Sequence, residues 1–238
     1  MLLALSFAAA AQQPVKVATL GYLSPSSPSL ERPLLEAFRQ GLHDLGYEEG
    51  KNIAVEIRYA EGKLNRLPDL VAELVRLKPD IIVTAGEAAI RSAEQATRTL
   101  PIVMANSGDP VGSGLVASLA RPGGNITGLS ILSPELSGKA LELLGETFPK
   151  ITRMAILWNS ANASKVLDFK EAQAAAAALK VQLQSLEVRS PKDFDIVFRA
   201  ATEKRSETLS VRAESLTLFH RKRTSTSRSR ADCQLSMN

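Results

Sequence analysis

Short apolar segments alternate with amphipathic segments along most of the chain, and this alternation restricts the folds open to it. Apolar residues spaced three and four apart indicate helices, whereas short apolar runs and strict alternation indicate strands. In the first half, strands are predicted at 15–22, 53–59, 81–84, 102–105 and 126–129, and helices at 32–46, 64–77 and 88–97. Repeated strand–helix units of this kind predict a parallel sheet flanked by helices.

The alternation starts again after residue 130. Helices are predicted at 134–148, 166–179 and 193–204, and strands at 153–158 and 181–188. We therefore expect an α/β chain with two doubly wound parallel-sheet lobes. The first lobe is expected at residues 14–130, and the second, which is incomplete, at residues 131–223.

The first thirteen residues, MLLALSFAAAAQQ, are typical of a secretory signal peptide. An apolar run is followed by small residues suited to cleavage and then by polar glutamines, and the run is too short to span a bilayer. No basic segment precedes the run, so we expect a signal peptide whose n-region is missing. An apolar first strand is the alternative.

The last fifteen residues, 224–238, break with the style of the preceding chain. They have almost no apolar periodicity and are rich in Ser, Thr and Arg. One interpretation is a disordered tail. The other, which we favour, is an out-of-frame tail, because codons shifted by one base across 231–238 can encode Arg-Leu-Pro-Ala-Gln-Tyr-Glu.

The net charge of +4 arises at the C-terminal end of the chain. Residues 199–238 hold 9 Lys and Arg and 4 Asp and Glu, which leaves 20 basic against 21 acidic residues in 1–198. A nucleic-acid-binding surface needs a basic patch or stripe, and the body of the chain has none. We therefore expect no nucleic-acid partner.

Polar residues and glycines follow several of the predicted strands. In an open parallel sheet, the loops at the carboxyl ends of the strands converge on one crevice, where ligands bind. Free N–H groups at the start of a following helix suit a carboxylate. The candidate ligand-binding residues are Tyr22, Leu23, Ser24, Ala85, Gly86, Glu87, Asn106, Ser107 and Asp109 in the first lobe and Asn159 in the second.

The segment 101–130 contributes three of these residues and contains six glycines. Glycine is used where the backbone takes a positive φ or is approached closely. We expect 106–109 to form part of the ligand-facing wall and 121–124 to be a structural turn. The alternative for Asn106 and Asp109 is that they only cap or close a turn. Asn162 or Ser164 is expected to cap the helix after Asn159.

The sequence contains no recognisable catalytic constellation. The first predicted strand is not followed by GxGxxG, and neither a Walker motif nor a GxSxG elbow occurs. One cysteine, Cys233, and two histidines, His43 and His220, are too few and too scattered for a metal site. We expect no catalytic residues, no metal and no cofactor.

Five runs between about residues 14 and 204 carry a family resemblance. They are QQPVKVATLGYLSP, GLHDLGYEEGKNIAVEIRYAEG, LPDLVAELVRLKPDIIVTAG, IVMANSGDPVGSGLVASLARPGGNITGLS and SGKALELLGETFPKITRMAILWN. With these runs the chain resembles the ABC-transporter substrate-binding proteins of the tryptophan/tyrosine-type family, which are similar to type I periplasmic binding proteins.

The resemblance implies an extracytoplasmic solute-binding component of an ABC importer, not an enzyme. It implies two lobes joined by a hinge that close on a small ligand, an amino acid or related compound that is often aromatic, and delivery to permease subunits in the membrane. Members continue for about a hundred residues beyond the HRKR at 220–223. The resemblance therefore also implies a truncated or frameshifted product with impaired function.

Two other functions stay open on the residues alone. A cytoplasmic ligand-sensing domain, such as the effector half of a repressor, has a similar sheet pattern. It would require a DNA-binding helix-turn-helix before residue 15, where the sequence is alanine-rich and apolar. A nucleotide-dependent α/β enzyme would require a phosphate-binding loop after the first strand, and the sequence has none there.

Overall fold

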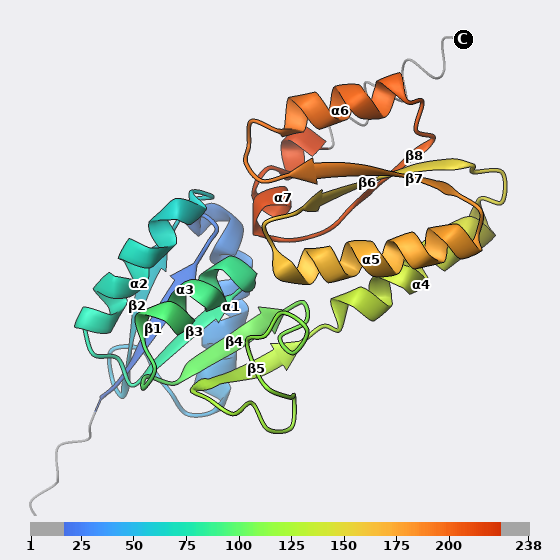
Figure 1. Cartoon of the computed structure of the whole chain (residues 1–238). Coiled ribbons are helices and arrows are strands. Elements are labelled where there is room, and N and C mark those ends of the chain that lie inside the picture. The colour runs from blue at the N-terminus through green and yellow to red at the C-terminus, as the bar shows by residue number, and fades with distance from the viewer. Residues whose placement is uncertain (1–16, 225–238) are drawn as a thin grey trace, which may run out of the picture.

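The computed structural model describes residues 17–224, which form two α/β lobes (Figure 1). The predicted signal peptide at 1–13 and nearly all of the predicted out-of-frame tail lie outside the described residues. The strands and helices of the first lobe fall within residues 18–130, and those of the second within residues 133–219. Strands pair in parallel in both sheets, which confirms the predicted fold class.

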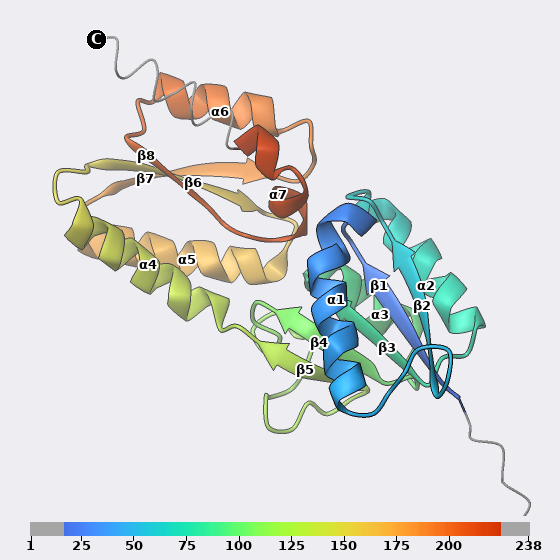
Figure 2. The same cartoon turned by 180° about the vertical axis from the view of Figure 1, so that it is seen from behind.

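The first sheet has the strand order β2-β1-β3-β4-β5. Its strands are β1 (Ala18–Ser24), β2 (Ile53–Tyr59), β3 (Ile81–Ala85), β4 (Ile102–Ser107) and β5 (Ile126–Ser130). Helix α1 (Pro28–Asp44) covers one face, and α2 (Leu67–Arg76) and α3 (Glu87–Ala96) cover the other (Figures 1 and 2). A short 3₁₀ helix, η1 (Leu64–Arg66), leads into α2.

Side chains alternate between the two faces of β1, as the strand period of two requires. Leu20 and Tyr22 pack with Leu35 of α1, whereas Leu23 belongs to the core on the opposite face together with Leu74 of α2. The apolar stripe that predicts α2 in the sequence therefore faces the sheet.

The second sheet has the order β7-β6-β8 among the described residues. Its strands are β6 (Arg153–Asn159), β7 (Gln182–Val188) and β8 (Thr208–Val211). Helices α4 (Ser133–Thr147) and α5 (Ala163–Ala178) lie against one face, and α6 (Phe194–Glu203) and α7 (Ser215–Phe219) pack on the opposite core. On the α5 side, Trp158 stacks on Phe169 with the ring centroids 4.6 Å apart. Trp158 is therefore part of the core.

The observed elements differ from the sequence-based predictions in several places. Strands β1 and β4 continue to Ser24 and Ser107, each two residues beyond its predicted end, and helix α5 begins at Ala163, three residues before its predicted start. Helix α1 begins earlier than predicted, because Pro28 suits the first turn of a helix, where its missing N–H is not needed. Strand β8 and helix α7 lie in 205–223, where no element was predicted, since one has four residues and the other five.

The chain passes from the first lobe to the second at residues 130–133. Ser130 ends β5 and pairs with Ser107, and the N–H of Ser133 donates to the carbonyl of Gly108 at 2.9 Å. Between them, Leu132 has a φ of 47°, in the left-handed region that leucine rarely adopts. Such a conformation persists where its surroundings impose it. The crossing is therefore tied to the loop that follows β4.

Candidate functional site

Three loops at the carboxyl ends of first-lobe strands contact the second lobe, and each does so at a glycine. A Cβ at any of these positions would overlap the partner side chain, so the backbone is approached as closely as only glycine permits. The loops follow β2, β3 and β4, and the partners belong to α5 and α7. The pairs are Gly62 with Phe219, Gly86 with Ser215, Gly108 with Ser164, and Gly112 with Leu167.

The contact at Gly108 lies beside the crossing between the lobes. A Cβ on Gly108 would be 3.1 Å from Ser164 Cβ and would overlap Ser164 Oγ. Ser107 and Ser164 are both buried, and within residues 17–224 neither hydroxyl has a hydrogen-bond partner. Buried polar groups are nearly always paired, and a serine hydroxyl can both donate and accept. One hydroxyl from each lobe can therefore serve a molecule held between the lobes.

Glu87 begins α3 directly after Gly86 and is buried. Its Oε1 accepts a hydrogen bond from Arg91 Nη2 at 2.7 Å, and the same nitrogen donates to the carbonyl of Ser113 at 2.7 Å. Its Oε2 has no hydrogen-bond partner among the described residues. An acidic side chain is favourable at a helix N-terminus, and the Arg91 pairing stabilises this one further. The pair also holds the loop after β4 against α3.

The other polar residues of the first-lobe edge make local contacts. Ser24 ends β1, and its Oγ accepts from the N–H of Ser26 at 3.1 Å. The carbonyl of Asn106 accepts from the N–H of Gly86 at 3.0 Å, which joins the ends of β3 and β4. Asp109 Oδ1 accepts from the N–H of Gly112 at 2.8 Å. Asp109 thus closes a turn, which is the alternative that the sequence leaves open. Asn106 is exposed, and its side-chain amide is available to a ligand.

In the second lobe, Asn159 ends β6 and is buried. Its Oδ1 accepts from the N–H of Ala161 at 2.9 Å, and its Nδ2 donates to Glu214 Oε2 at 3.4 Å. Glu214 also accepts from the N–H of Thr217 in a capping box that starts α7. Burial raises the pKa of Glu214 above its ordinary value. These bonds fix α7 to the end of β6, and Asn162 caps α5 as predicted.

A buried polar cluster joins α4, α5 and the residue after β8. Lys165 Nζ donates to Asp168 Oδ2 at 2.6 Å and to Ser133 Oγ at 2.8 Å, and Ser133 Oγ donates to Asp168 Oδ2 at 2.6 Å. Arg212 Nη1 donates to Ser137 Oγ at 3.1 Å. Since Ser133 begins α4 immediately after the crossing, the cluster fixes α4 to α5 next to the first lobe.

Seven of the ten predicted ligand-binding residues lie in the last two residues of a strand or in the loop that follows it, and Glu87 begins α3. The seven are Ser24, Ala85, Gly86, Asn106, Ser107, Asp109 and Asn159. The loop position predicted for Tyr22 and Leu23 is wrong, because both lie within β1. Leu23 is buried in the core, and Tyr22 packs on Phe38 and donates its hydroxyl to Glu31 at 2.6 Å.

Sequence reasoning missed the residues of the second lobe that face the first. Ser164 was considered only as a helix cap, and Ser215 and Phe219 lie on the helix that was not predicted. One signal could have located α7, namely the three-residue spacing of Glu214 and Thr217, which forms the capping box. The contact of Phe219 with Gly62 joins residues far apart in the sequence, so no local pattern indicates it.

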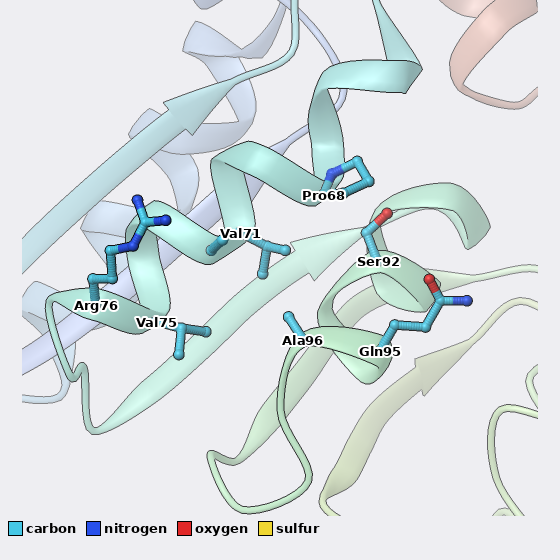
Figure 3. A pocket seen from close by; sticks show the side chains of 8 residues that line it. Pro68, Val71, Val75, Arg76, Ser92, Gln95 and Ala96 are labelled. Atoms are coloured by element: carbon cyan, nitrogen blue, oxygen red, sulfur yellow. The ribbon is translucent and has the colours of Figure 1, made fainter.

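A groove of about 430 Å³ lies on the outer helical face of the first lobe, between α2 and α3 (Figure 3). Val71 and Val75 of α2 line one side of it, and Ser92 and Gln95 of α3 line the other. None of the predicted ligand-binding residues lines this groove. Across residues 17–224, no three His, Cys, Asp or Glu side chains gather as a metal site requires, and no helix has the length and apolar character to cross a membrane.

Comparison with known proteins places these features in a family. Residues 24–215 match the family model described as ABC transporter substrate binding protein. The curated tyrosine-binding protein of Clostridioides difficile (strain R20291) is 33% identical over 139 residues, which make up 56% of this chain and 39% of that protein. The chain therefore spans less than half the length of this curated relative.

Two solved structures share the fold over both lobes. A conserved domain protein from Vibrio cholerae O1 biovar El Tor has a TM-score of 0.81 and 28% identity, covering 91% of this chain and 72% of the other. The ABC domain from Streptococcus pneumonia in complex with L-Trp has a TM-score of 0.82 and 24% identity, covering 90% and 71%. The family match covers most of the sequence, and this chain belongs to the ABC transporter substrate-binding protein family, whose members are binding proteins and not enzymes.

Proposed function

We propose that this chain is the extracytoplasmic solute-binding component of an ABC importer and that it binds a small amino-acid-like ligand between its two lobes. The observation that carries the proposal is the pair of buried hydroxyls at Ser107 and Ser164. They come from opposite lobes and lack protein partners among residues 17–224; Ser107 directly precedes Gly108, and Ser164 is the residue that Gly108 contacts. A ligand that hydrogen-bonds to both would join the lobes.

The surrounding groups suit the two charged ends of an amino acid. The free N–H groups at the start of α3 and the hydroxyls of Ser24 and Ser107 are suited to a carboxylate. The unpartnered Oε2 of Glu87 and the carboxylate of Asp109 are suited to an ammonium group. Asn106 and Asn159 supply amides from either lobe. We assign these residues, with Ala85 and Gly86, to the ligand site.

We further propose that the ligand is an aromatic amino acid. The curated relative is a tyrosine-binding protein, and one structure with the same fold holds L-Trp. Hinge motion at 130–132 would bring the segments 14–130 and 131–223 together around the ligand, and permease subunits would receive it from the closed form. The family match favours this role over a cytoplasmic sensing domain.

Titration calorimetry on the full chain tests the ligand class. We expect L-tryptophan or L-tyrosine to bind with a Kd of about 1 μM or tighter, which corresponds to roughly −8 kcal/mol. Indole and phenol, which lack the amino-acid group, serve as controls and should not bind measurably. Absence of heat with all aromatic and aliphatic amino acids would refute the amino-acid proposal.

Substituting Gly108→Ala should weaken amino-acid binding about ten- to a hundred-fold, as expected when an added methyl group is forced into a packed contact. The new Cβ would overlap Ser164 Oγ when the two lobes are in contact. Because Gly108 does not have a positive φ, backbone strain does not contribute. The measurement is the Kd from calorimetry. The matched control is a double-mutant cycle with Ser164→Gly, in which the alanine should have little effect. An equal loss in both backgrounds would contradict closure at this contact.

A further inference from the structure

Helix α7 is a short element that is anchored to the second lobe at both ends. At its start, Glu214 accepts from the N–H of Thr217 and from Asn159 Nδ2. At its end, the His220 ring packs edge-on against Phe219 with centroids 5.2 Å apart and lies 5.6 Å from Phe194. Phe194, the first residue of α6, is fully buried in the core. Helix α7 therefore moves with the second lobe as one body.

The same helix contacts the first lobe at two points. Ser215 Oγ would be 2.8 Å from a Cβ on Gly86, in the loop after β3. A Cβ on Gly62 would be 2.6 Å from Phe219 Cε1 and 2.7 Å from Cγ, so the ring lies directly on the backbone of the loop after β2. Both views show α7 on the side of the second lobe that faces the first (Figures 1 and 2).

The contact between Phe219 and Gly62 is far from the crossing between the lobes. The crossing follows β5, at one edge of the first sheet, and Gly62 follows β2, at the opposite edge. A contact placed at the edge opposite the crossing separates farthest when the lobes rotate about 130–132. Its two residues therefore move the most relative to each other during the closing motion, whereas contacts beside the crossing, such as Gly108 with Ser164, move little.

We propose that α7 is the latch of the binding site, with Phe219 the positioning residue that sets how readily the two lobes close. This inference rests on the proposed hinge motion and deepens it. Phe219 touches the backbone of Gly62 through an apolar ring, so its contribution requires no ligand. Burial of the ring against Gly62 stabilises the closed arrangement, and the lobes open by separating these two residues.

The latch determines apparent affinity through the closed population. A ligand that binds the closed arrangement has an apparent Kd equal to its intrinsic Kd divided by the closed fraction. Removing part of the Phe219 ring contact should therefore weaken binding without touching the ligand. We expect Phe219→Ala to weaken L-tryptophan or L-tyrosine binding about ten-fold, and Phe219→Leu, which keeps an apolar side chain, to weaken it less.

Distances between spin labels report the latch independently of any ligand. Cysteines introduced at the exposed positions Glu36 of α1 and Arg199 of α6, in a chain carrying Cys233→Ser, place one label on each lobe. Double electron–electron resonance without ligand should give a distribution with longer distances for Phe219→Ala than for the parent. The matched control is Leu218→Ala, because Leu218 neighbours Phe219 on α7 and is 52% exposed.

The outcomes separate the latch from the proposed function. A longer distribution for Phe219→Ala, an intermediate one for Phe219→Leu and an unchanged one for Leu218→Ala support the latch, provided that circular dichroism shows equal helix content. Identical distributions for the parent and Phe219→Ala overturn it. Failure of the parent to bind any amino acid refutes the proposed function, but the distances measured without ligand still test the latch.

Discussion

Substituting Asp168→Ala is expected to destabilise the second lobe by about 3–5 kcal/mol. The Asp168 side chain is 1% exposed and that of Lys165 is 6% exposed, so the ion pair between them lies in the interior. Removing the carboxylate leaves the ammonium of Lys165 buried with Ser133 Oγ as its remaining partner in the cluster. Urea unfolding followed by circular dichroism measures the loss. Breaking one partner of a buried pair is costly because the other charge stays in a medium that solvates it poorly.

Two further variants distinguish this cause from a general effect of helix substitutions. Glu142→Ala on α4 removes a partner of Lys139 from an exposed pair, and its effect should stay within about 0.5 kcal/mol. The double substitution Lys165→Met with Asp168→Leu removes both charges of the pair and should recover the part of the loss that comes from the unpaired ammonium, although the buried Arg212 still loses its attraction to Asp168. A double variant as unstable as Asp168→Ala would show that the unpaired ammonium of Lys165 does not account for the destabilisation.

The fold could be predicted from the sequence because the patterns that indicate its helices and strands are local. The helical stripe of α2 and the alternating residues of β2 each bury one face, and these periodicities appear within a dozen residues. The bounds of β1 were less predictable. Leu23 continues the strand because it pairs with both β2 and β3, and Ser24 because it pairs with β2, and that support comes from distant segments.

The candidate site could be predicted only in part, for the same physical reason. The general rule for parallel sheets locates Ser24, Gly86 and Asn106 at the carboxyl edge of the first sheet without any knowledge of contacts. Ser164 and Phe219 could not be assigned in this way, because their position depends on how the second lobe is placed against the first. The glycines of these loops indicate a positive φ or a close approach to the backbone, but the sequence does not show that the approaching residues belong to the second lobe. Gly108 is required by a contact between the lobes, whereas Gly62 is required both by its contact with Phe219 and by its φ of 74°.

The second large effect is expected at Gly128, in the middle of β5. Gly128 has a φ of 139°, and a Cβ there would be 2.7 Å from the backbone N of Met104 and 2.8 Å from its carbonyl carbon, and would overlap its carbonyl oxygen. Because Met104 and Gly128 are paired residues of β4 and β5, the obstruction is backbone and cannot be relieved by a side-chain rotation. We expect Gly128→Ala to destabilise the first lobe by about 2–6 kcal/mol through backbone strain and overpacking.

The matched control for Gly128→Ala is Gly124→Ala in the preceding turn. No heavy atom lies within 4 Å of a Cβ built on Gly124, so the same added methyl group meets open space there. Urea unfolding should therefore show an effect within about 0.5 kcal/mol for Gly124→Ala and a large loss for Gly128→Ala. The comparison also concerns function, because β5 leads into the crossing at 130–133, and a strand detached from β4 cannot hold that crossing in place. Equal stabilities of the two variants would mean that β5 does not pair closely with β4 at Met104. Other contacts would then have to hold the crossing at 130–133 in place.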